Sequence, residues 1–466
     1  MHLAEKTQTR DLARELNVWH ATAIVVGTII GSGIFLVSKD MMQAVGSAGL
    51  VYLAWIVGGL LSFFGALTYA ELGAVRPWAG GEYVYVRDAY GPLPGFLYAW
   101  TWFVIAKPGS IATVTSGIVR VLGSFPAFSF LPHALITWHI THHRTFVVTW
   151  GHLVAILATI LITALNYVGV RKAGNFQLAF TALKVVMIAG IAIAGFTAAS
   201  GSVSNFSTHF PGATGGLTGF VAALVAALWA YDGWNDLNMV SGEIRDPERS
   251  IPMALIAGVG LVAVLYMGMN AAIQYALPAT TIATSNVPAA EALREAIGNW
   301  GAALVSAGMA LSMLVTLNGT IMSGGRVPFA VARDRYFFRA LAEVHPRFRT
   351  PSLALVVQAL LAMVLLLIGG AFQELLSLTI FAEWLFYMVA ASTIFVFRRR
   401  EADKPRPYST WGYPVVPALF VLAAAGLLYI TFTDKLRNSV IGTAVILAGI
   451  PVYYYFARKR STTAAS

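Results

Sequence analysis

Two polar interruptions of apolar segments hold the residues of this sequence that could do chemistry. The first is GTIIGSGIF at residues 27–35, where Ser32 lies between two glycines, and the second is LWAYDGWNDLN at residues 228–238, with Asp232 and Asn235. Glycine destabilises a helix by roughly 1 kcal/mol relative to alanine, so both stretches favour unwinding. Unwound backbone at membrane depth survives only where protein or a water-filled cavity satisfies its polar groups. Each interruption therefore predicts a broken helix beside a binding site, although small residues also serve close helix packing.

A lysine inside an apolar segment is the third unusual feature. Lys184 lies about eight residues from either end of its segment, which is roughly 12 Å along a helix. That separation exceeds the comfortable reach of a side chain that extends to the membrane surface, which is the alternative explanation. The ammonium needs carbonyls, hydroxyls or a carboxylate nearby, or else must titrate. Lys184 is therefore a functional candidate, whereas Lys107, next to Pro108 and near one end of its segment, is predicted to have a structural role.

The elements that position these residues are long apolar helices. The chain has 466 residues, of which 58% are hydrophobic and 11% charged. Its mean hydropathy of +0.70 indicates an integral membrane protein. Runs of about 20 apolar residues suffice to cross a bilayer. Twelve such runs are predicted, approximately at 18–38, 47–73, 93–122, 147–168, 176–200, 217–241, 252–276, 297–325, 352–370, 372–397, 412–432 and 437–457.

The basic residues are distributed unevenly between the two sides of this predicted bundle. Most of the 31 Lys and Arg residues fall on the side of both termini, whereas the opposite side has only Lys39, Arg120, Arg144, Arg294, Lys435 and Arg437. This positive-inside pattern predicts that both termini are cytoplasmic. The net charge of +10 is thus explained by topology rather than by nucleic-acid binding. Residues 1–16 lack the apolar centre and cleavage site of a signal peptide and are expected to form a cytoplasmic tail.

The two interruptions occupy equivalent positions in the order of the predicted helices. Each falls in the first helix of a set of five, and an odd number of spans inverts the second set in the membrane. The predicted fold class is an all-α polytopic membrane protein with 12 transmembrane helices, a LeuT-type 5+5 inverted repeat and broken helices 1 and 6. The expected organisation is a tail at 1–16, a first repeat at 17–200, an inverted second repeat at 201–400, helices 11 and 12 at 401–457, and a cytoplasmic tail at 458–466.

The other residue types argue against several kinds of site. The sequence contains no cysteine, which excludes disulfides and thiol catalysis. His139, His142 and His143 lie in the longest predicted external link, 123–146, without a carboxylate or cysteine beside them, which favours a solvated loop over a metal site. No Ser/His/Asp or metal constellation accompanies the interruptions. We therefore expect neither an enzyme nor a bound cofactor or metal.

Two predicted cytoplasmic stretches connect the helices near the interruptions. AVRPWAGGEYVYVRDAYGP at residues 74–92 fits a short amphipathic helix near the membrane interface, or an ordinary loop with interfacial aromatics. SGEIRDPERSIP, directly after the second interruption, places Glu243 in a charged cluster. A gate and a solvated loop are equally compatible with that cluster.

Several of these stretches resemble the amino acid–polyamine–organocation superfamily, and within it the L-type amino acid transporter branch. The resemblance extends over most of residues 18–430. The similar stretches are GTIIGSGIF, GGEYVYVRDAYGPLPGFLYAWTWFVIAKPGS, AYDGWNDLNMVSGEIRDPERSIPMAL, the lysine of the fifth helix and the LNG element of the eighth.

This resemblance implies a substrate site for an L-amino acid at the two breaks. The carboxylate would bind N–H groups of the first break, and the ammonium would bind carbonyls of both breaks, which agrees with the polarity of half-helix ends. The implied substrate-binding residues are Thr28, Ile29, Ser32, Gly33, Trp229, Asp232 and Asn235. Trp229 matches the aromatic external gate of the branch, and Asn235 matches the polar residue below the substrate. Lys184 matches the lysine that stands where sodium-coupled relatives bind an ion, which implies transport without sodium.

Two departures from the branch bear on function. Its eukaryotic members pair with a heavy subunit through a cysteine, and without cysteine no disulfide-linked heavy subunit is expected here. Asp232 replaces a residue that is small in animal members. Its carboxylate could favour cationic substrates, carry a proton or cap the break.

The function predicted from these features is secondary transport of L-amino acids, neutral ones being favoured, by alternating access. Sodium-independent exchange across the cell (inner) membrane is the leading mode. Proton-coupled symport, with Asp232 or Lys184 titrating, is the alternative within transport. A non-transporting amino acid sensor is the alternative from another class, and a channel is disfavoured because the polar groups cluster at one depth.

Overall fold

The computed structural model describes residues 11–141, 144–368, 372–434 and 436–464. The helices and strands of the first half are α1 (Val18–Ile29), α2 (Gly33–Val45), α3 (Ala48–Val75), α4 (Glu82–Tyr90), α5 (Pro92–Thr101), a π-helical turn η1 (Trp102–Ala106), α6 (Lys107–Leu122), β1 (Ala134–Thr141), β2 (Arg144–Thr149), α7 (Trp150–Tyr167) and α8 (Val170–Gly195). Those of the second half are α9 (Gly216–Ala230), α10 (Asp236–Met239), α11 (Pro247–Ala276), α12 (Ala279–Thr284), α13 (Pro288–Ile297), α14 (Asn299–Gly324), α15 (Arg326–Arg333), α16 (Ser352–Ile368), α17 (Phe372–Arg400), α18 (Val415–Asp434), α19 (Leu436–Leu447) and α20 (Gly449–Ala464).

The apolar helices coincide with the predicted runs. Among the described residues, nine helices are long and apolar enough to cross a membrane, and α1 with α2 forms a further candidate, bent by 40°. The runs predicted at 217–241 and 352–370 correspond to α9 with α10 and to α16, whose apolar helices are shorter. The chain is therefore a polytopic helical membrane protein, and the count of twelve crossings stays a prediction.

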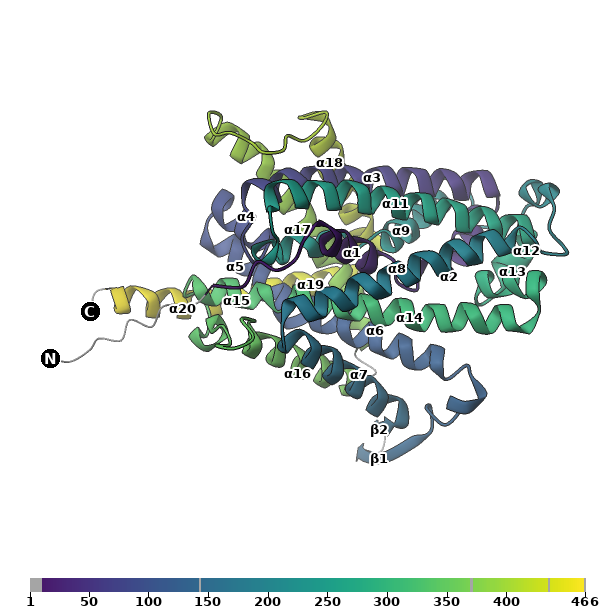
Figure 1. The fold of residues 1–466 in the computed structure, drawn as a ribbon, viewed down its shortest axis with the longest axis horizontal. Helices are drawn as coiled ribbons and strands as arrows, with labels where there is room; N and C mark the ends of the chain where they lie inside the picture. Colours follow the sequence, from purple (N-terminus) through teal and green to yellow (C-terminus); the bar gives the residue numbers. More distant parts are fainter. Residues whose placement is uncertain (1–10, 142–143, 369–371, 435, 465–466) are drawn as a thin grey trace.

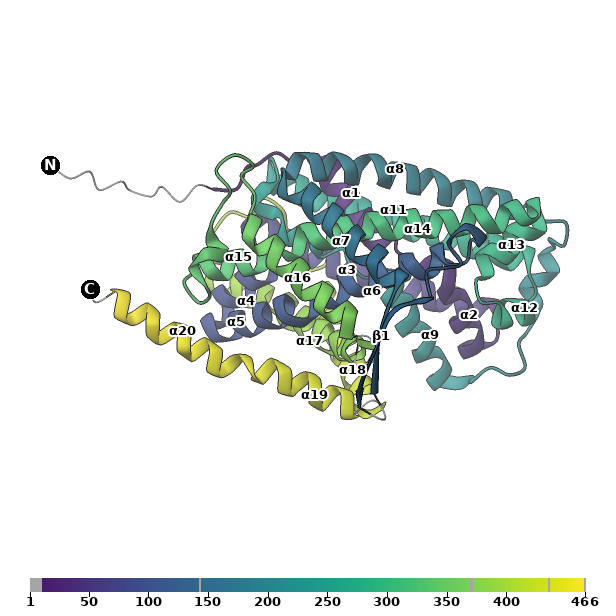
Figure 2. The same cartoon turned by 90° about the horizontal axis from the view of Figure 1, so that it is seen from below.

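The long helices run roughly along one axis of the molecule (Figure 1). The described chain begins and ends at the left end in Figures 1 and 2, where α4, α15 and α20 also lie, whereas α12 and α13 lie at the opposite end. The ends of the described chain thus share one side of the bundle. Which side of the membrane that is stays a prediction.

Equivalent helices of the two predicted halves pack against each other. The second helix of each half pairs in the contact between α3 and α11, and the third in the contact between α6 and α14. An inverted repeat brings equivalent helices together in this way. The first helix of each half is broken, between α1 and α2 and between α9 and α10, as predicted.

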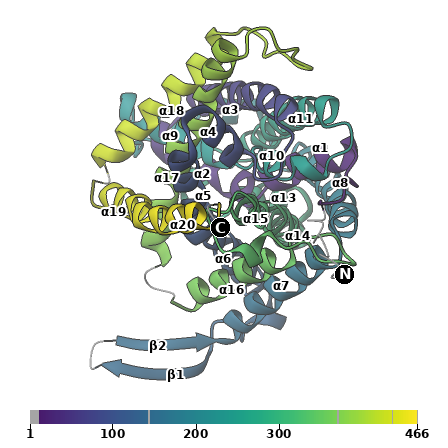
Figure 3. The same cartoon turned by 90° about the vertical axis from the view of Figure 1, so that its left-hand side faces the viewer.

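The link predicted as a solvated loop at 123–146 contains a β-hairpin instead. Strands β1 and β2 pair antiparallel and extend sideways from the bundle beyond α7 (Figure 3). β-Branched and aromatic residues in ALITWHIT and RTFVVT favour strands, which explains the difference. His142 and His143 lie outside the described residues.

The helices α3 and α17 are connected by a buried charge cluster at the end that carries α4. Glu71 of α3 accepts hydrogen bonds from Arg398 of α17 at 2.8 and 2.6 Å and from the backbone N–H of Thr410 at 2.7 Å. Arg406 lies 3.5 Å from the same carboxylate. Because Glu71 is only 3% exposed, its charge depends on these partners.

Replacing Arg398 with methionine should destabilise the protein by about 3 kcal/mol, because it leaves the buried Glu71 carboxylate poorly compensated. The measurement is the melting temperature of the purified protein in detergent. The double variant Glu71→Gln/Arg398→Met should melt higher than the single variant, since it removes the buried charge as well. A single variant that melts like the parent would contradict this role.

Candidate functional site

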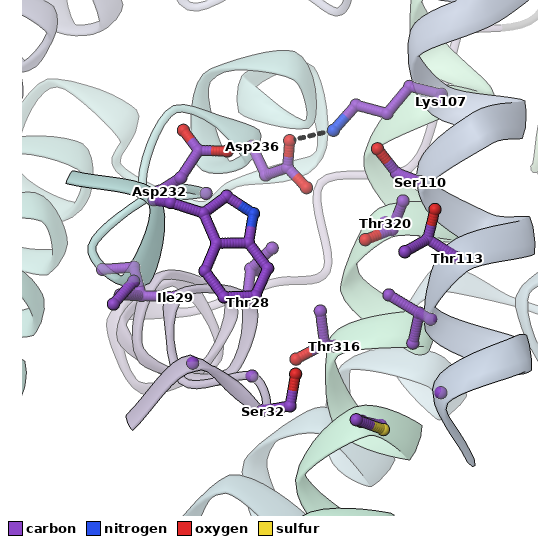
Figure 4. A pocket seen from close by; sticks show the side chains of 18 of the residues that line it. Thr28, Ile29, Ser32, Lys107, Ser110, Thr113, Asp232, Asp236, Thr316 and Thr320 are labelled. Atoms are coloured by element: carbon purple, nitrogen blue, oxygen red, sulfur yellow. Dashed lines mark hydrogen bonds and ion pairs between the residues drawn. The ribbon is translucent and has the colours of Figure 1, made fainter. Parts of the chain in front are cut away.

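One cavity of about 630 Å³ lies where the two broken helices meet. It is lined by all seven residues predicted to bind substrate: Thr28, Ile29, Ser32, Gly33, Trp229, Asp232 and Asn235. Figure 4 shows Asp232 and Asp236 on one wall and Ser110 and Thr113 of α6 opposite them. The structure therefore brings together residues that are about 200 positions apart in the sequence.

The first break leaves backbone N–H groups available at the cavity. α1 ends at Ile29 and α2 begins at Gly33, and between them the chain is not helical. The N–H groups of Ser32 and Gly33 form no hydrogen bond with any described residue. They belong to the start of α2, where a helix has unpaired donors and the positive end of its dipole. This part of the cavity suits an anion.

The carbonyls of the first break are occupied by side chains from α8 and α14. The Lys184 ammonium donates to the carbonyl oxygens of Gly27 at 2.9 Å and of Ile30 at 2.6 Å. Thr316 donates to the same two oxygens, and Ser312 donates to that of Ile30 at 2.8 Å. Lys184 is fully buried and does not line the cavity. It stabilises the break from behind rather than contacting a ligand.

The second break depends on a glycine conformation. Gly233 has φ +107°, and a Cβ atom there would lie 3.2 Å from the backbone of Thr28. A larger residue would be strained and would separate the two breaks. The carbonyls of Ile29 and Trp229, predicted to hold an ammonium, already accept bonds from Tyr266 at 3.2 Å and from the Asp232 N–H at 3.3 Å. Each carbonyl oxygen retains a second lone pair.

A hydrogen-bond network extends from the second break. The hydroxyl of Tyr387 in α17 lies 2.9 Å from Asp232 Oδ1 and 3.2 Å from Asn235 Oδ1, to either of which it donates. The Asn235 amide donates to Glu82 Oε1 at 2.7 Å. Asn235 thus lines the cavity and directs its amide nitrogen toward α4, and its place below a bound substrate stays a prediction.

Among the cavity residues that the sequence did not identify as such are Lys107, Glu383 and Tyr387. Lys107 lines the cavity and forms an ion pair with Asp236, which adds a cavity position to its predicted structural role. Glu383 and Tyr387 of α17 also line it. Glu383 was detectable, because an ionisable residue inside an apolar run is a functional candidate by default. Its carboxylate has no hydrogen bond or ion pair with any described residue.

The cavity extends along α6 toward the end of the bundle that carries α13. One face of α6 lines it with Lys107, Ser110, Thr113, Val114, Ser116, Gly117 and Arg120. Spacings of three and four place these residues on one side of the helix. From Lys107 to Arg120 this face is roughly 20 Å long.

The opposite end is closed by a buried ion pair. Arg326 of α15 binds Glu243 through two bonds, of 2.7 and 3.0 Å, and both side chains are fully buried. The N–H groups of Glu15 and Leu16 donate to the Glu243 carbonyl, both at 3.0 Å. Glu243 is therefore part of a closed contact between the N-terminal segment and α15, and not a solvated loop residue. Trp229, the other predicted gate, is 49% exposed and lines the cavity.

No metal cluster is present in the described part of the chain, where no three His, Asp or Glu side chains lie close enough to hold an ion. What the arrangement offers instead is unpaired N–H groups opposite carboxylates. The chemistry of such an arrangement suits a small molecule that carries both charges.

Comparisons with known proteins identify a matching family and several similar sequences. The family described as "Amino acid permease" matches residues 16–456. The chain is 31% identical to the serine/threonine exchanger SteT of Bacillus subtilis, with 98% of this chain and 100% of that protein covered. It is 31% identical to the b(0,+)-type amino acid transporter 1 of Mus musculus, over 96% and 89% of the two chains. It is 30% identical to the cystine/glutamate transporter of Homo sapiens, over 97% and 86%.

Cysteine labelling should distinguish the two faces of α6, since the chain has no native cysteine. Ser116 lines the cavity, whereas its neighbour Thr115 is fully buried against other helices. We expect a water-soluble maleimide to label Ser116→Cys at least about tenfold faster than Thr115→Cys, because only the former contacts water. Equal rates in the folded variants would contradict the position of the cavity.

Proposed function

The chain belongs to the amino acid permease family, and on that premise we propose that it carries L-amino acids as a sodium-independent exchanger that favours neutral substrates. The observation that carries the proposal is the meeting of both helix breaks in one cavity. Unpaired N–H groups at Ser32 and Gly33 suit the substrate carboxylate. Asp232 and the carbonyls of the breaks suit the ammonium.

Sodium independence is supported by the position of Lys184. Its ammonium bonds two carbonyls of the first break, at Gly27 and Ile30, which also accept hydroxyl groups of α14. An ammonium group at this point would take the place of a bound metal ion in holding the break. Transport then needs no sodium to complete the site.

Alternating access between the predicted repeats, 17–200 and 201–400, is the proposed mechanism. The Glu243–Arg326 pair closes the end of the bundle near the chain ends, and the cavity extends toward the other end beside Trp229. Residues 401–457 are proposed to be peripheral. Exchange requires that the pair separate and the cavity close around Trp229 before substrate leaves.

The protein is a multi-pass membrane protein, and we propose that it lies in the cell (inner) membrane with both termini cytoplasmic. Both ends of the described chain lie on the same side of the bundle, which supports this orientation (Figure 1). Because the sequence has no cysteine, no disulfide can link it to a heavy subunit. It is proposed to transport without one.

Proton-coupled symport is a second candidate, favoured by one observation. Asp232 and Glu383 both line the cavity, and neither is paired with a described basic side chain. Carboxylates without a counter-cation hold protons more readily than paired ones.

Uptake into proteoliposomes tests the proposed function. The pH is equal on both sides, and choline replaces sodium. Vesicles preloaded with amino acid should then accumulate labelled neutral amino acids at least about tenfold faster than empty vesicles. The reason is that the binding site of an exchanger changes sides only when it holds a substrate. Uptake that needs sodium would contradict the role of Lys184. Uptake only under an imposed proton gradient would favour symport, and binding without uptake would favour a sensor.

Filling the carboxylate site should abolish transport. A Cβ on Gly33 would lie 3.2 Å from Ala230, and an indole there would enter the cavity. Gly33→Trp should lower exchange by more than about a hundredfold, since steric exclusion removes the donors from the substrate. Gly260→Trp is the matched control, because nothing lies within 4 Å of a Cβ at that position. If Gly33→Trp exchanged like the control, the site would lie elsewhere.

A further inference from the structure

Glu82 is a buried carboxylate with neutral partners only. Four carboxylates in the described chain are buried: Glu71, Glu82, Asp236 and Glu243. The other three each form an ion pair, with Arg398, Lys107 and Arg326 respectively. Glu82 is fully buried, yet no described basic side chain lies within salt-bridge distance of it. An unpaired carboxylate in such a place is far more costly when charged than when protonated.

The hydrogen bonds of Glu82 fit either protonation state. Oε1 accepts from the Asn235 amide at 2.7 Å, and Oε2 lies 3.2 Å from the Tyr98 hydroxyl. In the charged state Tyr98 donates to Oε2. In the protonated state Oε2 carries the hydrogen and the hydroxyl turns to accept it, because a hydroxyl serves as donor or acceptor. Asn235 keeps its bond in both states.

The surroundings of Glu82 contain one cation and several groups that oppose its ionisation. The titratable side chains that interact with it electrostatically, one from each neighbouring element, are Tyr69 of α3, Tyr85 of α4, Tyr98 of α5, Lys107 of α6, Asp236 of α10 and Tyr387 of α17. α15 also contacts α4, where Asp334 binds Tyr83 and Arg87 rather than Glu82. Lys107 is engaged by Asp236.

Burial in this setting raises the pKa of Glu82 to about 7, against the hydrogen bonds and the charge of Lys107, which lower it. α4 connects two membrane-spanning helices and is not itself one. The group can thus change its charge near neutral pH.

Glu82 also contacts the part of the structure that must move. The backbone N–H of Gly80 donates to the carbonyl of Met239 in α10 at 2.9 Å. Gly81 has φ +50°, and a Cβ there would lie 2.8 Å from the backbone of Asn238 and Met239. The start of α4 therefore lies directly on α10, the inner half of the second break. Movement of α10 would admit water to Glu82.

We propose that Glu82 is a proton-binding site of the transport cycle, linked to the substrate cavity through Asn235 and Tyr387. In the closed arrangement Glu82 Oε2 holds a proton. When α10 moves away and water enters, the proton leaves to that side, and it returns before α4 and α10 close again. The inference rests on the proposed transport function, because it assigns the proton to the same conformational cycle.

The sign of the pH dependence follows from burial. The pKa of Glu82 rises from its ordinary value near 4.5 to about 7 on closure, so closure is most favourable below pH 4.5. It becomes less favourable as the pH rises to 7, by up to about tenfold per pH unit, and levels off above. Exchange that passes through the closed arrangement should fall over the same window.

Exchange in preloaded proteoliposomes, with the same pH inside and outside, tests the proposal between pH 4.5 and 8.5. The wild type should slow as the pH rises to 7, whereas Glu82→Gln should lose most of this slowing, because the amide keeps both hydrogen bonds without a charge. Asp88→Asn is the matched control on the same helix, where a partly exposed carboxylate pairs with Arg76, and it should keep the wild-type profile.

The outcomes separate this inference from the proposed function. A folded Glu82→Gln variant that retains the wild-type pH profile, or that does not exchange at acidic pH, would overturn the proton site. Neither result would contradict the proposed exchange function of the wild type. A wild type that transports no amino acid under any condition would overturn the function itself.

A second measurement on the wild type guards against a Glu82→Gln variant that does not fold. Calorimetry of neutral amino acid binding at pH 6, in two buffers with different ionisation heats, should give different apparent heats, because proton uptake by up to about one per carrier accompanies closure. Identical heats in the two buffers would overturn the inference.

Discussion

Backbone groups released from a helix inside a membrane need partners, and this requirement organises the whole centre of the molecule. At the first break, Lys184, Ser312 and Thr316 satisfy the carbonyls from one side. The N–H groups of Ser32 and Gly33, which line the cavity, form no hydrogen bond with any described residue. The break is thus held by side chains of α8 and α14 on one surface and left available for a ligand on the other. Lys184 thus contributes to the architecture of the break although it does not line the cavity.

Charges inside the bundle follow a second rule, that each buried carboxylate is matched by a basic group from a distant segment. Glu71, Asp236 and Glu243 are matched in this way, and each match connects helices from different parts of the chain. Glu82 departs from the rule with amide and hydroxyl partners. Because Glu82 lies without a basic partner at the contact between α4 and the second break, it is the carboxylate to which we assign a change of charge. The ion pairs connect helices elsewhere in the bundle, whereas the contact at Glu82 is proposed to depend on the pH.

Local composition was sufficient to predict the breaks, because glycine and polar residues inside apolar runs oppose helix wherever they occur. It also predicted Lys184 as a functional residue, and the seven cavity residues followed from the family resemblance. It did not predict partners that depend on packing. Glu82 and Asn235 are 153 positions apart, and Tyr387 reaches the second break only because α17 lies beside it. The hairpin was missed because its alternation is short and lies within a link between long helices.

The attachment of the N-terminal segment to Glu243 has a mechanical consequence. The N–H groups of Glu15 and Leu16 hold the carbonyl of this residue, and α1 begins only two residues after Leu16, at Val18. This connection is therefore too short to absorb a movement of the Glu243 segment. Any displacement of the Glu243 segment therefore also displaces α1. As a result, the closed end of the bundle and the first break move together and not independently.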